Sequence, residues 1–239
     1  MHLFLFILVN ILGSLLQGIV GIGQGLFATP LALTFLGKDE VMTAMIVAGV
    51  VLNGFLLFKV PVQKTKVRLW PLVLWGIIGL PIGVFILIMT PLDELKVAVG
   101  VLAVLLAAAV LYGKLHLAHR RWALPAASLL AGILQTSIGM PGAAIGVALA
   151  ASGIPKDQMR RTLVTYFFVI SLLTVPFYYL GGVLTLSGIT LGLIAAPFII
   201  VAGYYGNTIA KHVSPARYTR LAMAVVALSG AYAIFSGLR

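Results

Sequence analysis

The chain has 239 residues, of which 62% are hydrophobic and 9% are charged, and this composition predicts one membrane domain without a separate soluble domain. It contains no cysteine, which excludes disulfides, thiolate metal sites and cysteine nucleophiles. A formal net charge of +11 would indicate nucleic-acid binding in a soluble protein. Here the basic residues stand in short loops between apolar stretches, where membrane topology and lipid headgroups account for them, so no nucleic-acid partner is expected.

The first predicted element, residues 3–36, is an apolar stretch too long for one membrane crossing and too short for two full ones. Glycines interrupt it near its middle, at 21–25. We interpret it as a re-entrant hairpin of two short half-helices, which enters the membrane and returns to its starting side. Three full crossings are predicted after it, centred near residues 49, 79 and 102.

The second half of the chain repeats this pattern. A second apolar stretch, 123–152, is broken by glycine and proline at 139–142, and further crossings are centred near residues 169, 196 and 226. A shift of 118 residues places Gln17 on Gln135 and Gly21 on Gly139. Chance similarity between glycine-rich apolar segments is the alternative explanation. The predicted domains are a first transmembrane repeat at 1–112, a cytoplasmic linker at 113–122 and a second repeat at 123–239.

The basic residues give each repeat a direction. If every apolar stretch crossed once, the sixteen Lys and Arg residues would divide equally between the two faces, which inner-membrane proteins rarely show. If both broken stretches are hairpins, thirteen share one face, and only Lys38, Lys96 and Arg239 share the other with the N-terminus. The positive-inside rule makes the first face cytoplasmic and both termini extracytoplasmic.

An odd number of crossings in each repeat makes the repeats inverted copies of each other. The predicted fold is therefore an all-α membrane protein with two inverted repeats, each a glycine-broken re-entrant hairpin plus three transmembrane helices. Inverted repeats are the architecture of many secondary transporters, whose substrate site lies where the repeats meet.

Glycines of the first hairpin form a recognisable run, Gly18-x-x-Gly21-x-Gly23-x-Gly25, followed by Pro30 and Leu31. The run resembles the first-repeat signature of the TauE/SafE sulfite exporter family of membrane permeases. A weaker copy, similar to the family's second-repeat signature, consists of Gly132, Gly139, Pro141 and Gly142. The chain departs from the family's pattern at two positions, and these departures bear on which substrate it carries. Gln24 interrupts the glycine cluster, and Pro141 stands where the first repeat has Gly23.

The resemblance covers essentially the whole chain. It implies a secondary transporter of the bacterial inner (plasma) membrane that moves a small organic or sulfur-containing anion by alternating access. Sulfite, sulfoacetate and related sulfonates or carboxylates are the substrates it suggests. The identity of the anion, the direction of transport and any coupling ion stay open. The expected partners are this anion and the lipid bilayer, a homodimer is left open, and neither a cofactor nor a metal is expected.

The charged residues independently favour an anionic substrate. All five carboxylates and all four histidines lie in or beside loops, so a buried-carboxylate relay for protons or cations has no residues to use. Half-helices that stop inside the membrane point unpaired N–H groups and a positive dipole end at the site. Glycines there permit positive φ and let an oxyanion approach the backbone, although they would equally serve tight helix packing.

Polar side chains at membrane depth complete the predicted site. Gln17 and Gln135 occupy equivalent positions before the two breaks, where each amide either donates to the anion or bonds between helices. Asn53 and its counterpart Ser171 lie in mid-span with the same alternatives. The predicted substrate-binding residues are Gln17, Gly21, Gly23, Gln24, Gly25, Asn53, Gln135, Thr136, Ser137, Gly139, Gly142 and Ser171.

One pair of basic residues has a simpler explanation than substrate binding. Membrane topology alone explains Arg160 and Arg161, but they could also draw anions to a cytoplasmic entrance.

An enzyme would need a nucleophile with a base, a carboxylate pair or a metal cluster, and no histidine or carboxylate lies at membrane depth to supply one. The protein is therefore not expected to be an enzyme. An anion channel of the same fold and a non-transporting membrane subunit stay open as alternatives.

Overall fold

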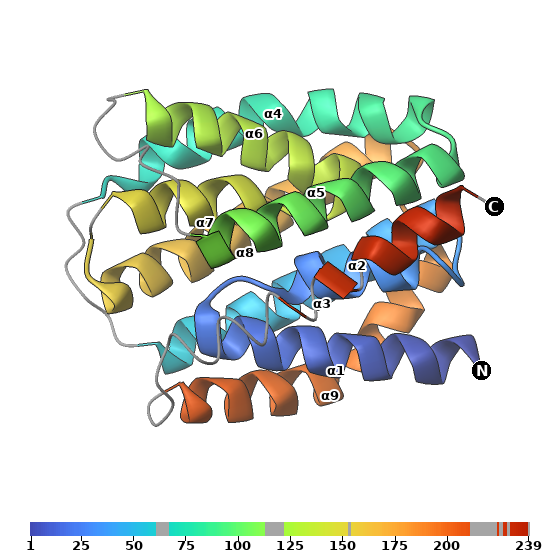
Figure 1. Ribbon diagram of the computed structural model, residues 1–239, viewed down its shortest axis with the longest axis horizontal. Helices are drawn as coiled ribbons and strands as arrows, with labels where there is room; N and C mark the ends of the chain where they lie inside the picture. The colour runs from blue at the N-terminus through green and yellow to red at the C-terminus, as the bar shows by residue number, and fades with distance from the viewer. Residues whose placement is uncertain are drawn as a thin grey trace.

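The computed structural model describes residues 1–60, 67–112, 122–152 and 154–210, together with 224, 227–228 and 230–238. Every regular element in these ranges is a helix (Figure 1). Five of the described helices are long and apolar enough to cross a membrane: α1 (His2–Val20), α3 (Lys38–Lys59), α4 (Leu69–Met89), α8 (Lys156–Leu180) and α9 (Leu186–Ile209). The others are α2 (Gln24–Ala32), α5 (Leu92–Tyr112), α6 (Ala123–Ile138) and α7 (Gly142–Ala151), and residues 230–237 are also helical. Of the predicted linker, 113–122, only Trp122 lies within the described residues.

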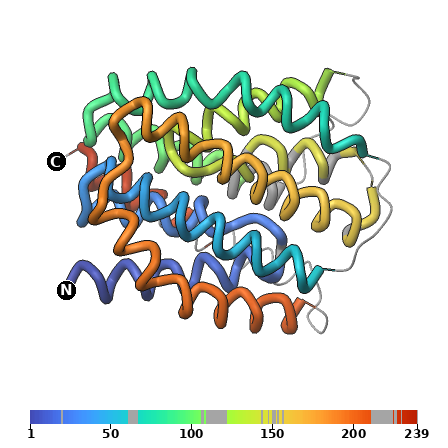
Figure 2. Tube along the Cα trace, turned by 180° about the vertical axis from the view of Figure 1, so that it is seen from behind, coloured from blue at the N-terminus to red at the C-terminus, as the bar shows by residue number. Residues whose placement is uncertain are grey.

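Two helical hairpins enter the bundle from opposite ends. The N-terminus, the end of α2 and the end of the helical segment 230–237 lie at one end of the molecule (Figures 1 and 2). The start of α6 and the end of α7 lie at the other end, so the hairpin α6–α7 runs opposite to the hairpin α1–α2 (Figure 1). Each long helix that follows a hairpin therefore starts at a different end, α3 beside the N-terminus and α8 opposite it.

The expectation of short half-helices is wrong for α1. The helices α2, α6 and α7 have 9, 16 and 10 residues, but α1 has 19 and is long enough to cross. Its earlier glycines, Gly13 and Gly18, do not end it, because a helical glycine costs only about 1 kcal/mol relative to alanine. Gly18 also has a packing role, since a Cβ there would lie 2.7 Å from the carbonyl oxygen of Gly203 on α9.

Helices of one half of the chain pack mainly on helices of the other half. The closest pairs are α1 with α9 and α4 with α6, and α3 packs on both α9 and α8. At the α4–α6 crossing the backbones touch, because a Cβ on Gly132 would overlap the Gly76 carbonyl oxygen. Small residues of this kind allow close approach of helices within membranes.

Basic side chains close the C-terminal ends of two helices. Lys38 Nζ donates to the carbonyl oxygens of Leu87 (2.9 Å) and Thr90 (2.8 Å) at the end of α4. Arg161 donates from one guanidinium nitrogen to the carbonyl oxygen of Leu57 (2.6 Å) at the end of α3. Cations at these positions satisfy carbonyls that have no helical partner and oppose the negative end of the helix dipole.

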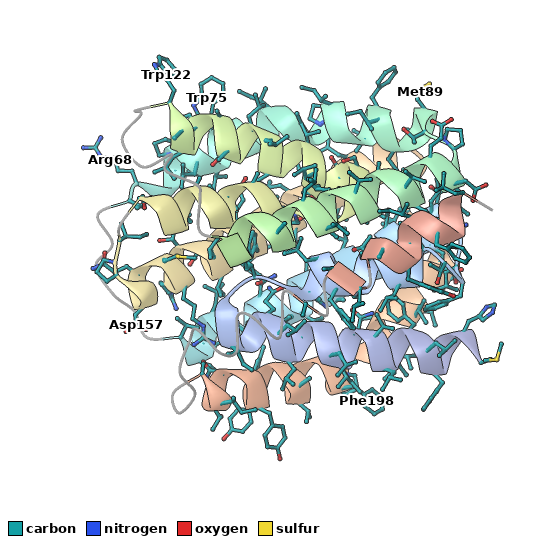
Figure 3. All side chains as sticks on the ribbon, viewed as in Figure 1. Arg68, Trp75, Met89, Trp122, Asp157 and Phe198 are labelled. Carbon is teal, nitrogen blue, oxygen red and sulfur yellow. The ribbon has the colours of Figure 1, made fainter. Side chains whose placement is uncertain are left out.

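Aromatic side chains divide between the outer surface and the core. Trp75 and Trp122 point outward on the same side as Arg68, as Figure 3 shows, and tryptophans at such positions anchor a protein among lipid headgroups. Tyr166 and Tyr178 are buried instead, and their hydroxyls donate to carbonyl oxygens of α6. These two tyrosines are thus packing residues that hold α8 to α6.

Candidate functional site

Each hairpin turns at a glycine in the left-handed region. Gly21 ends α1 with φ 91°, and Gly139 ends α6 with φ 68°. Gly23, just before α2, has φ 145°. Side chains are strained at such angles, so glycine at these positions is a requirement of the backbone. The turns bring the first residues of α2 and α7 to the middle of the bundle.

One cavity lies where the two hairpins meet α3 and α8. It has about 510 Å³ of empty space, counting the part open to the exterior, and no charged side chain of the described residues lines it. Nine of the twelve predicted site residues line it: Gln17, Gly23, Gln24, Gly25, Asn53, Gln135, Gly139, Gly142 and Ser171. The structure therefore brings together residues from both halves that are far apart in the sequence.

In the first half of the chain the amides at this cavity bond to one another. Gln17 Nε2 donates to Asn53 Oδ1 at 2.7 Å, and Gln17 Oε1 accepts from the backbone N–H of Gln24 at 3.3 Å. Gln24 Nε2 donates in turn to Asn10 Oδ1 at 3.2 Å, and Asn53 Nδ2 donates to the Gly49 carbonyl oxygen at 2.8 Å. This network ties α1 to the start of α2 and to α3.

In the second half the equivalent side chains are unengaged. Gln135 and Ser171 are both buried and both line the cavity. Within the described part of the chain, neither side chain makes a hydrogen bond. Their amide and hydroxyl donors are thus available to a ligand in the cavity.

The backbone supplies further donors. The N-cap residues of α2 and α7 are Gly23 and Pro141, neither of which has a side chain that can accept a hydrogen bond. The first four N–H groups of a helix have no helical acceptor. Gln17 satisfies the N–H of Gln24, but those of Gly25 and Leu26 have no such partner, and both residues line the cavity. Two uncapped helix N-termini therefore meet at one site.

Three predicted residues lie away from the cavity. Thr136 Oγ1 donates to the Leu80 carbonyl oxygen at 2.8 Å, and Ser137 Oγ donates to the Ile133 carbonyl oxygen at 2.7 Å. Successive helical residues point about 100° apart, so these two cannot share the direction of Gln135. Gly21 lies against α8 instead.

The glycines divide between backbone geometry and packing. A Cβ on Gly25 would overlap the carbonyl oxygen of Gly139, so the two breaks touch at this point. A Cβ on Gly142 would lie 3.2 Å from the Ile22 side chain. Gly25 thus serves close contact between the hairpins, while Gly23 and Gly139 serve the turns.

Some residues that line the cavity were not predicted from the sequence. Met42 and Met45 precede Asn53 on α3 and line the cavity with Met140 and Phe167. The methionines fall on the same helical face as Asn53, and this spacing could have identified them. Asn10 was also missed, although it stands seven residues before Gln17 and is fully buried.

No group of three or more His, Asp or Glu side chains that could hold a metal occurs among the described residues. The one ion pair that the structure describes, between Lys96 and Asp93 at 2.9 Å, is at a helix start far along the chain from the cavity residues. The donors at the cavity are therefore neutral amides, a hydroxyl and backbone N–H groups.

Comparison with known proteins identifies the family. No curated protein and no solved structure matches the chain. The family described as Sulfite exporter TauE/SafE matches over residues 5–233, which is nearly the whole chain. The family match and the apolar helices together identify the protein as a multi-pass membrane protein of the exporter type. The chain belongs to the TauE/SafE sulfite exporter family.

Proposed function

We propose that the protein is a secondary transporter that moves a small organic or sulfur-containing anion across the bacterial inner membrane by alternating access. Sulfite, sulfoacetate and related sulfonates or carboxylates are the candidate substrates. The family suggests a sulfite or sulfonate exporter type of transporter, and the cavity between the hairpins is the proposed binding site.

The observation that carries this proposal is the convergence of neutral donors on one cavity. The N-termini of α2 and α7, the Gln135 amide and the Ser171 hydroxyl all meet there. Helix N-termini favour negative charge through their dipoles and unpaired N–H groups. No carboxylate is present among the described lining residues to neutralise a cation, so the chemistry fits an anion.

The two halves support an inverted repeat. Gly21 and Gly139 are 118 residues apart and both end a helix in the left-handed region. The starts of α3 and α8, at Lys38 and Lys156, are separated by the same 118 residues. Since the two hairpins enter from opposite ends (Figures 1 and 2), this repetition with reversed direction favours a transporter built from inverted repeats.

The residues that line the cavity are unevenly distributed between α3 and α8. Met42 and Met45 of α3 line it, whereas their equivalents on α8, Arg160 and Leu163, do not. The cavity therefore continues along α3 toward the end that carries the N-terminus (Figure 1). If both termini are outside, as the thirteen-to-three distribution of basic residues favours, the larger share of the cavity lies toward the extracytoplasmic end.

Transport by purified protein in liposomes tests the proposal. We expect saturable uptake of labelled sulfite or sulfoacetate, and counterflow accumulation against a gradient when the liposomes are preloaded with unlabelled anion. Flux that only dissipates a gradient would instead identify an anion channel. Absence of flux for sulfite, sulfonates and short carboxylates, from protein that is folded, would contradict a transport function.

A further inference from the structure

The helices α3 and α8 turn equivalent faces toward the cavity. Three equivalent residues line it on α3, but only two of them do so on α8. On α8 this face carries Arg160, Phe167 and Ser171, which are seven and four residues apart and so share one side of the helix. Phe167 and Ser171 line the cavity, and Arg160 does not. The equivalents of all three on α3, which are Met42, Gly49 and Asn53, line it. Arg160 is thus the one residue of the three on α8 that the cavity does not reach, although its equivalent on α3, Met42, lines the cavity.

Arg160 has an unusual environment for a residue placed by topology alone. It is only 9% exposed, and one guanidinium nitrogen donates to the Gly18 carbonyl oxygen near the end of α1. Its Nε is buried without a hydrogen-bond partner in the described part of the chain. A buried charge with an unused donor lowers the stability of the fold, which points to a functional reason for its position. A cation at the membrane surface would satisfy the positive-inside rule equally well.

The side chain also lies against the first break. A Cβ on Gly21 would stand 3.3 Å from Arg160 Cγ, and the next two residues of the break, Ile22 and Gly23, line the cavity. Arg160 is therefore separated from the cavity by the turn of the hairpin. Along α8 it is about 10 Å from Phe167, toward the helix start at the basic face.

We propose that Arg160 contacts the transported anion in the state that opens toward the basic face, and that its guanidinium leaves the Gly18 carbonyl oxygen to do so. The proposal rests on the proposed transport function. When access alternates, inverted repeats exchange their arrangements, so α8 takes the role that α3 has here. Arg160 then stands where Met42 stands now.

This exchange makes the two access states unequal in charge. In the present state the cavity offers neutral donors and Met42, but in the opposite state it would also offer a guanidinium. Charge-assisted hydrogen bonds are roughly twice as strong as neutral ones, and Arg can bind a sulfonate or carboxylate through two N–H groups. The anion should therefore bind more tightly from the basic face than from the opposite face.

Initial rates of sulfoacetate and sulfite uptake, measured in right-side-out and inside-out vesicles, test this inference. In Arg160→Met, which installs the residue found at the equivalent position of the first repeat, KM from the basic face should rise by about 10- to 100-fold. KM from the opposite face should change by less than about threefold, a shift under 1 kcal/mol. Arg160→Lys should recover part of the lost affinity, because it keeps the charge but not the paired N–H groups.

Arg161→Met is the matched control, because Arg161 also donates to carbonyl oxygens at a helix end but lies one residue off the cavity face. It should change KM from neither face. If Arg160→Met is not recovered as folded protein, Arg160→Gln, which keeps a neutral donor for Gly18, carries the same expectation. An equal change from both faces, or none from the basic face, would overturn the role of Arg160 alone. A wild-type protein inert toward every probe anion would overturn the proposed function on which it rests.

Discussion

The two hairpins share one backbone plan but differ in the state of their polar side chains. In the first hairpin, Gln17 bonds to Asn53 and to the start of α2, so both its amide nitrogen and its amide oxygen have a protein partner. In the second, Gln135 faces the same cavity without a partner among the described residues. The two hairpins are thus alike in their backbone turns and differ in the hydrogen bonding of their glutamines. We infer that the first hairpin positions the site and the second supplies its side-chain donors.

The largest effect is expected where the two hairpins touch. Gly25→Ala would drive its Cβ into the Gly139 carbonyl oxygen, which is backbone and cannot rotate away. Overpacking of this kind costs about 1–3 kcal/mol or more and should separate the hairpins. Thermal unfolding of the purified protein in detergent should show a clearly lower Tm and a poor yield.

Gly37→Ala is the control for that experiment. Gly37 has φ −67°, and a Cβ there would meet no atom within 4 Å. Its Tm should match the unmodified protein. Equal stability of both variants would show that the close approach of the hairpins is not needed.

A smaller loss of stability is expected from the first-hairpin network. Gln17→Ala leaves Asn53 Oδ1 and the Gln24 N–H without their partner, which costs about 1–3 kcal/mol for buried groups. Tm should fall, and KM should change less than in the corresponding variant of Gln135. If Gln17→Ala kept its Tm but lost affinity, the assigned division between the hairpins would be reversed.

The smallest effects belong to the hydroxyls beside Gln135. Thr136→Val and Ser137→Ala remove side chains that donate to helix carbonyls and do not line the cavity. Affinity for the substrate should stay within about threefold, under 1 kcal/mol, because no ligand contact is lost. A tenfold rise in KM for either variant would place that residue in the site after all.

The sequence was informative where a residue type has one physical use. The glycine breaks were predictable because only glycine adopts the left-handed turn freely, and Gln17, Asn53, Gln135 and Ser171 were predictable as polar groups at membrane depth. The nine predicted residues at the cavity are either glycines of the two breaks or polar residues, and Gln24 belongs to the polar group. Their roles in binding stay predictions.

What the sequence did not reveal depends on side-chain direction and pairing. Thr136 and Ser137 were as polar as Gln135, but the helix turns them toward carbonyls of α4 and α6. The first break lies at Gly21–Gly23, where it was predicted, but α1 before it has 19 residues and is long enough to cross, so it is not a short half-helix. Hydrogen bonds between Gln17 and Asn53, 36 residues apart, follow only from the three-dimensional arrangement.

The most direct test of an anion site built from neutral donors is to measure the affinity for the transported anion in the unmodified protein, in Gln135→Ala and in Gln135→Glu. A lost hydrogen bond to a charged ligand is worth about 1.5–3 kcal/mol, so alanine should weaken binding by roughly 10- to 150-fold. Glutamate should be weaker still, because it places a negative, acceptor-only group against the anion. Affinity for the anion should therefore fall in the order glutamine, alanine, glutamate. An order with glutamate above alanine would contradict an anion site built from neutral donors.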